Sequence, residues 1–149
     1  MEKNSPQNPD HGSEYEFLVI SGLIYDNSAW QKMPFLAADD FINPVCHAAF
    51  TAIQALMKKG TPIDFTILSD ELVKANSPIR DMSPFATAFT SQPTVSLIIE
   101  NGLRLKEKSI QRQAITLMNQ VIANQAPLGG LDQLITLKGE LARATNGFQ

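Results

Sequence analysis

The chain has a single cysteine, no long hydrophobic run and few charged side chains among its 149 residues. Cys46 has no second cysteine to pair with, so the sequence predicts a cytoplasmic protein without an internal disulfide. No apolar run approaches the roughly 18 residues of a membrane-spanning helix. The polar N-terminus is unlike a signal peptide, so we expect no membrane partner. Charged residues make up 18% and hydrophobic residues 44%, a balance that predicts a buried core and excludes general disorder.

The sequence also lacks the motifs of common nucleotide sites and catalytic centres. Neither G-x-x-x-x-G-K-[ST] nor G-x-G-x-x-G occurs in it. Cys46 and His47 are adjacent, and neighbouring residues on a helix point about 100° apart, which suits neither chelation nor a nucleophile pair. We therefore predict no catalytic residue, no metal site and no cofactor. Two alternatives stay open: a small enzyme that uses Asp39, Asp40 or His47, and a ligand pocket floored by Trp30, Phe35 and Phe41.

Apolar residues recur at spacings of three and four, and no segment alternates apolar and polar residues. We therefore expect an all-α protein. Ser13 followed by Glu16 forms a capping-box pattern, which predicts that the first helix begins at residue 14. Asn43 before Pro44, and Asp64, predict two further helix starts. The expected helices span residues 14–25, 45–59, 65–75, 94–124 and 131–145, with short helical turns at 30–33, 39–41 and 85–89.

We expect three parts along the chain, within one domain overall. Residues 1–13 are rich in Pro, Asn and Ser without periodicity and predict a flexible arm. Residues 14–93 predict a small helical head. Residues 94–149 predict a C-terminal antiparallel helical hairpin, because a short turn at 127–130 joins its two helices. Gly102 lies inside the first of these helices, where glycine costs about 1 kcal/mol against alanine, so its continuity is open to question.

Charge is unevenly distributed along the chain. Residues 1–99 hold 6 basic and 11 acidic side chains, whereas residues 100–149 hold 6 and 4. The net charge of −3 disfavours nucleic-acid binding as the main function, since neutralising phosphates requires clustered basic groups. Arg104, Lys108 and Arg112 recur every four residues. They form the one edge of the hairpin that is a candidate for weak nucleic-acid contact.

Five segments in order carry a family resemblance. They are EYEFLVISGLI (14–24), YDNSAW (25–30), ADDF (38–41) with HAAF (47–50), GTPIDFTIL (60–68) and KEKSIQR (106–112). Together they resemble the N-terminal domain of DnaB-type bacterial replicative helicases, over about residues 14–145. One departure is that Met82-Ser83-Pro84-Phe85 stands where the family usually has Gly-Gly before Tyr-Leu.

The resemblance implies a collar without catalysis of its own. The resemblance implies that such domains pair through their hairpins and heads into a trimer of dimers at one end of a ring hexamer. The expected partners are further copies of the chain, primase, and a helicase loader or helicase ATPase domain, with DNA contacted indirectly. An alternative is a stand-alone phage or plasmid regulator that mimics the collar and binds a host helicase. The predicted interface residues are Ile110, Ala114, Leu117, Met118 and Val121, with Leu134 and Leu141 on the second helix. The alternative is that these residues pack only within their own hairpin.

Overall fold

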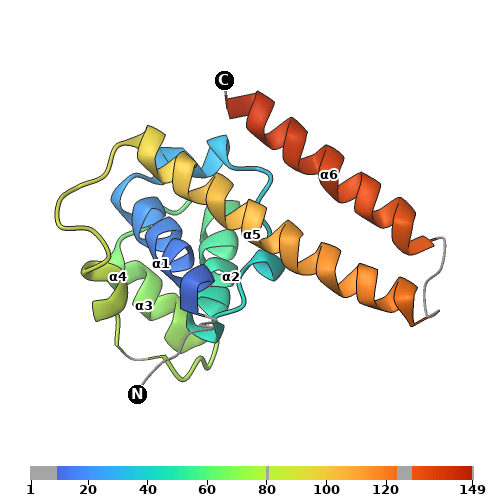
Figure 1. Cartoon of the computed structure of the whole chain (residues 1–149). Helices are drawn as coiled ribbons and strands as arrows, with labels where there is room; N and C mark the ends of the chain where they lie inside the picture. The colour runs from blue at the N-terminus through green and yellow to red at the C-terminus, as the bar shows by residue number, and fades with distance from the viewer. Residues whose placement is uncertain (1–9, 80, 124–128, 149) are drawn as a thin grey trace, which may run out of the picture.

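The computed structural model describes residues 10–79, 81–123 and 129–148 (Figure 1). The regular elements in these ranges are all helical, which confirms the all-α class. No helix in them is long and apolar enough to cross a lipid bilayer. In chain order the elements are α1 (Asp10–Tyr25), η1 (Asn27–Lys32), η2 (Ala38–Asp40), α2 (Pro44–Lys58), α3 (Phe65–Lys74), α4 (Ser83–Ala86), α5 (Val95–Ile122) and α6 (Gly129–Phe148).

The first helix begins earlier than predicted. α1 begins at Asp10, so Ser13 lies inside the helix and not before it. The capping-box prediction is wrong because Glu16 has other partners. Its carboxylate accepts the backbone N–H groups of Ile42 and Asn43, at 3.2 and 3.0 Å. The last four residues of the predicted arm are therefore helical, and residues 1–9 lie outside the described part.

Two of the predicted helix starts are confirmed. Asn43 Oδ1 accepts the N–H groups of Val45 and Cys46 at the start of α2, at 2.9 and 3.3 Å. Asp64 Oδ1 accepts the N–H of Ile67 at the start of α3, at 2.8 Å. These short-range caps satisfy amide donors that have no partner within the helix.

Several helix boundaries in the second half of the chain differ from prediction. α4 ends at Ala86 and not at residue 89, and α5 ends at Ile122 and not at residue 124. α4 starts at Ser83 rather than at residue 85, because Pro84 fits the first helical turn, where an N–H would have no partner. α6 starts at Gly129 and continues to Phe148, so the predicted turn at 127–130 is partly helix. Residues 124–128 lie outside the described part.

We define the head as α1 to α4 with η1 and η2. The first half of α5 covers the core of the head. α5 crosses α1 closely, since a Cβ on Gly22 would lie 2.7 Å from Ile98 Cγ1. Gly102 does not interrupt α5; the Met33 sulfur occupies the space that a side chain there would need. Both glycines therefore serve close packing.

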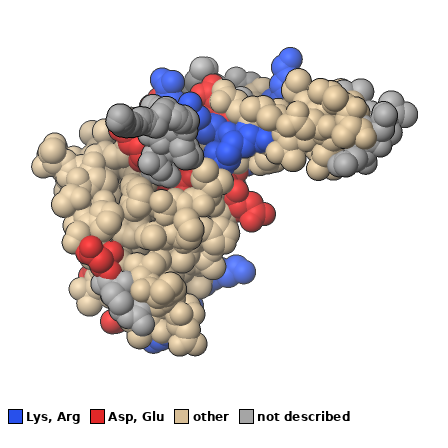
Figure 2. Space-filling model, turned by 60° about the horizontal axis from the view of Figure 1, so that its bottom comes forward, with Lys and Arg blue, Asp and Glu red and all other residues tan. Residues whose placement is uncertain are grey.

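α5 packs on the head with its first half and forms the first helix of the hairpin with its second half. Its buried residues run from Ile98 to Ile110, and the residues of α5 beyond Ile110 are partly buried or exposed. The second half of α5 packs against α6, and the two helices lie side by side in opposite directions (Figure 1). The outer part of the hairpin projects away from the head (Figure 2).

Candidate functional site

The outer half of the hairpin carries an exposed apolar stripe. Ile115, Met118 and Ile122 of α5 are 60%, 52% and 78% exposed. Their spacing of three and four residues places them on one face of the helix. Ile135 of α6 is 70% exposed. We call these four exposed residues, three on one face of α5 and one on α6, the apolar stripe. Exposed apolar side chains that gather on one element mark an interaction surface more often than scattered ones do.

The part of the stripe on α5 lies in an uncharged segment, whereas Asp132 and Lys138 lie about one turn to either side of Ile135 on α6. Between Arg112 and Asp132 the sequence contains no Asp, Glu, Lys or Arg. Figure 2 shows basic side chains gathered on the hairpin near the head, while the projecting part is mostly uncharged. A surface of this kind loses little solvation of charge when another apolar surface covers it.

The predicted interface residues fall into different environments. Ile110 is buried where α5 leaves the head. Ala114, Leu117 and Val121 are partly buried, on a face about 100° from the stripe. Met118 is exposed and belongs to the stripe. The side chains of Leu134 and Leu141 lie outside the described part.

A cluster of polar side chains joins α5 to the head. Asp40, at the end of η2, is 2% exposed. Lys106 Nζ lies 3.3 and 3.4 Å from its two carboxylate oxygens. Ser109 donates its hydroxyl to Asp40 Oδ1 at 2.6 Å, and the Ala37 N–H donates to Oδ2 at 2.8 Å. Each oxygen of this buried carboxylate therefore has a partner from α5.

Arg112 and Glu16 extend the cluster to a third helix. The Arg112 guanidinium donates to the Asp40 carbonyl oxygen at 2.9 Å. Burial raises the pKa of Glu16 of α1, a fully buried residue, and the charge of Arg112 offsets part of that rise. We call Glu16, Asp40, Lys106, Ser109 and Arg112 the polar joint. Glu16 bonds to the segment directly after η2, and Asp40 of η2 bonds to α5, so these contacts connect α1, η2 and α5 where the hairpin begins.

Two of the three basic side chains of the candidate nucleic-acid edge form hydrogen bonds within the chain. Arg104 Nε donates to Glu100 Oε2 at 3.0 Å, one turn back on α5. Arg112 belongs to the polar joint. Lys108 is partly buried and, among the described residues, has no hydrogen bond or ion pair. Nucleic-acid contact by this edge stays a prediction, with Lys108 as its least engaged cation.

Replacing Glu16 by glutamine is expected to change how stability depends on pH. Burial raises the pKa of Glu16 from the ordinary 4.5, while its two backbone donors, Arg112 and His47 act in the opposite direction. The stabilising contribution of this group is therefore full below its unfolded pKa and lost as pH rises through the raised folded pKa. Glutamine does not titrate. As the pH rises from the unfolded pKa to the raised folded pKa, the free energy of unfolding of Glu16→Gln should thus rise relative to that of the wild type.

Urea unfolding of both proteins at a series of pH values above 4.5 measures this difference. A difference in unfolding free energy that stays constant with pH would show that burial does not govern the titration of Glu16.

The residues of the enzyme alternative do not converge on a reaction site. Asp40 is held in the polar joint. His47 donates from Nδ1 to the Ala38 carbonyl oxygen at 2.9 Å. Cys46 is fully buried, and burial raises the pKa of its thiol well above the usual range, which suppresses the reactive thiolate. No group of three His, Cys, Asp or Glu gathers in the parts of the chain that are described.

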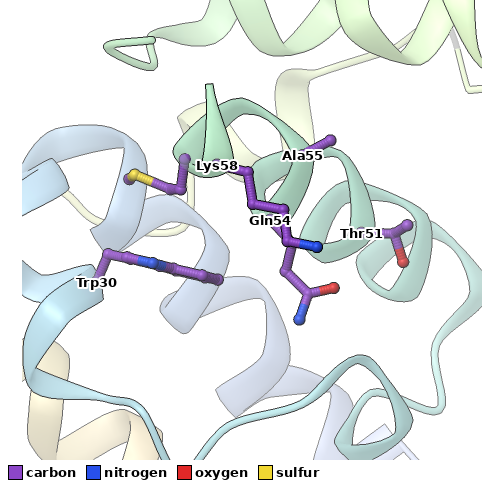
Figure 3. A pocket seen from close by; sticks show the side chains of 6 residues that line it. Trp30, Thr51, Gln54, Ala55 and Lys58 are labelled. Atoms are coloured by element: carbon purple, nitrogen blue, oxygen red, sulfur yellow. The ribbon is translucent and has the colours of Figure 1, made fainter. Parts of the chain in front are cut away.

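An open groove of about 510 Å³ lies between η1 and the outer face of α2. Figure 3 shows Trp30 on one side and Thr51, Gln54 and Lys58 along α2 on the other. Of the three aromatics predicted to floor a pocket, Trp30 lines this groove, whereas Phe41 is buried in the core. Lys58 is the one ionisable group in the lining, so the groove offers no acid–base pair.

Sequence reasoning missed three of the four residues of the apolar stripe. It chose the neighbouring face of α5, because helical periodicity identifies an apolar face but does not say which neighbour covers it. The signal that was available is the uncharged interval between Arg112 and Asp132. In a surface helix of a monomer, the solvent-facing side normally carries charged residues.

Comparison with known proteins gives a consistent set of relatives. A family model described as the DnaB-like helicase N terminal domain matches residues 8–100. The replicative DNA helicase DnaB of Pasteurella multocida is 27% identical over 116 residues, which cover 76% of this chain and 25% of that protein. The one from Haemophilus influenzae is 27% identical over 128 residues, covering 83% and 27%. The chain spans about a quarter of the length of these relatives.

Proposed function

This chain belongs to the DnaB-like helicase N-terminal domain family, and from that membership we propose that it is the collar domain of a replicative DNA helicase. It acts by assembly: copies pair through their hairpins, and the pairs build a ring hexamer. The ring carries a docking surface for primase and for a helicase loader. ATP hydrolysis belongs to a separate ATPase domain, and this chain contributes no catalysis.

The observation that carries the proposal is the apolar stripe. Ile115, Met118, Ile122 and Ile135 are exposed on both helices of one projecting hairpin. A two-helix hairpin has little core of its own and gains stability when a second apolar surface covers it. In a twofold pair, the same stripe on each copy would cover the other.

The experiment is sedimentation velocity of the chain over a range of concentrations. The wild type is expected to shift from monomer to dimer or larger species as concentration rises. In the variant Ile115→Asp/Ile122→Asp, association would bury two unpaired carboxylates on each copy. We expect its dissociation constant to rise about 100-fold or more, so that it sediments as a monomer.

A matched control separates the stripe from exposed apolar residues in general. Val73 of α3 is 51% exposed, close to the exposure of Met118, but it lies on the head. Val73→Asp should associate as the wild type does. A wild type that stays monomeric at every concentration, or a stripe variant that associates normally, would overturn the proposal.

A further inference from the structure

Three of the five segments that carry the family resemblance meet at the polar joint. Asp40 comes from the third, Lys106, Ser109 and Arg112 come from the fifth, and Glu16, from the first, bonds to the two amides that follow Phe41. None of these residues belongs to the apolar stripe. The resemblance therefore includes a set of contacts that the assembly surface does not use, and these contacts surround the point where α5 leaves the head.

We propose that the polar joint sets the direction in which the hairpin leaves the head, with Asp40 and Arg112 as its positioning residues. Ile110 is the last buried residue of α5. Ser109 and Arg112 flank it, and both bond to Asp40. Among the described residues, these are the last hydrogen bonds along α5 that reach the head.

The chemistry of these contacts suits a positioning role. A buried ion pair adds little net stability compared with apolar packing, because both charges lose their hydration. Hydrogen bonds, however, are directional, and they weaken steeply when donor and acceptor turn away from each other. Asp40 accepts from Lys106 and Ser109 along one face of α5, and its carbonyl accepts from Arg112. A rotation of α5 would break several of these bonds together.

The length of α5 amplifies any error in this direction. Ile122 lies ten residues beyond Arg112, which is about 15 Å along a helix axis. A rotation of about 10° at the joint therefore moves the end of α5 by roughly 2.5 Å. A displacement of that size is enough to misalign an apolar surface that has to match a partner.

The proposal is tested by measuring the distance between head and hairpin within one chain. Spin labels are placed at K74C, on the exposed face of α3, and at A123C, at the end of α5. Cys46 stays in place because it is buried and its thiol is unreactive. Doubly labelled protein is diluted in an excess of unlabelled chain, so that pulsed electron resonance reads distances within one molecule. The result is therefore independent of self-association.

Two variants of the joint are compared with the wild type. Arg112→Gln removes the guanidinium from a partly exposed position. Asp40→Asn/Lys106→Met removes both charges of the buried pair together, so that neither is left unpaired. In both, the distance distribution between the labels should broaden or shift by about 2.5 Å or more. In the wild type it should be narrow.

The controls separate direction from general loosening. Arg104→Gln breaks the exposed Glu100–Arg104 pair on the same helix and should leave the distribution unchanged. A label pair within the head, at Q31C and K74C, should keep its wild-type distribution in every variant. Joint variants with the wild-type distribution between head and hairpin would overturn the proposal. Equal broadening of the pair within the head would also overturn it.

Discussion

Replacing Asp40 by alanine is expected to lower the free energy of unfolding by about 3–5 kcal/mol, the range for breaking a buried ion pair from one side. The reason is the state of the partners that remain. The Lys106 side chain is only 10% exposed, so its ammonium would lose its counter-ion in a poorly hydrated site. The Ser109 hydroxyl and the Ala37 N–H would lose their acceptor at the same time.

A double-mutant cycle identifies the stranded charge as the cause. Asp40→Ala/Lys106→Met removes both ions, and methionine fills much of the space of the lysine side chain. We expect this double variant to be more stable than Asp40→Ala alone, since no unpaired buried charge remains. Urea unfolding followed by circular dichroism measures each corner of the cycle. Additive losses would mean that Asp40 and Lys106 do not act as a pair.

The helix starts that the sequence predicted correctly depend on contacts within a few residues. Asn43 and Asp64 cap helices through amides two and three residues ahead, and such a cap can be recognised from the local pattern alone. The resemblance adds information of longer range, because it implies the fold of whole relatives. The all-α class could be predicted on both grounds.

Glu16 shows where local reasoning stops. The same glutamate fits a capping box in the sequence. Its partners, however, are the backbone amides of Ile42 and Asn43, which follow it by 26 and 27 positions in the sequence. Asp40 and Lys106 are 66 residues apart. Short-range patterns carry no information about such pairs, since the fold alone decides which distant groups meet. The polar joint therefore had no signal in periodicity or capping.

The apolar stripe illustrates a different limit. Both faces of the second half of α5 are apolar, with Leu117 on one and Ile115 on the other. Periodicity cannot decide which of them packs against α6 and which faces solvent. The choice depends on the position of the second helix, which follows from tertiary packing. The uncharged interval marks this part of α5 as unusual, and the exposed fractions of the side chains identify the face that meets solvent.

The largest effect of a single apolar truncation is expected at Phe50. This side chain is 1% exposed. Its ring stacks on that of Phe41, with 4.5 Å between the ring centroids, and lies against Trp30, with 5.4 Å between the centroids. Phe50→Ala removes a whole ring from a site with rigid aromatic neighbours, so the cavity has little chance to collapse. We expect a loss of about 3–5 kcal/mol in the free energy of unfolding.

Trp30 gives this prediction a local readout, because it is the only tryptophan in the chain. Loss of the Phe50 ring exposes more of the indole to solvent, so its emission should move to longer wavelength in the folded variant. Phe50→Leu is the matched control, since it keeps most of the volume and should cost less than about 1.5 kcal/mol. A Phe50→Ala variant that unfolds at the wild-type urea concentration with unchanged emission would contradict this prediction. That result would mean that the groove on α2, and not the core beneath it, determines the environment of Trp30.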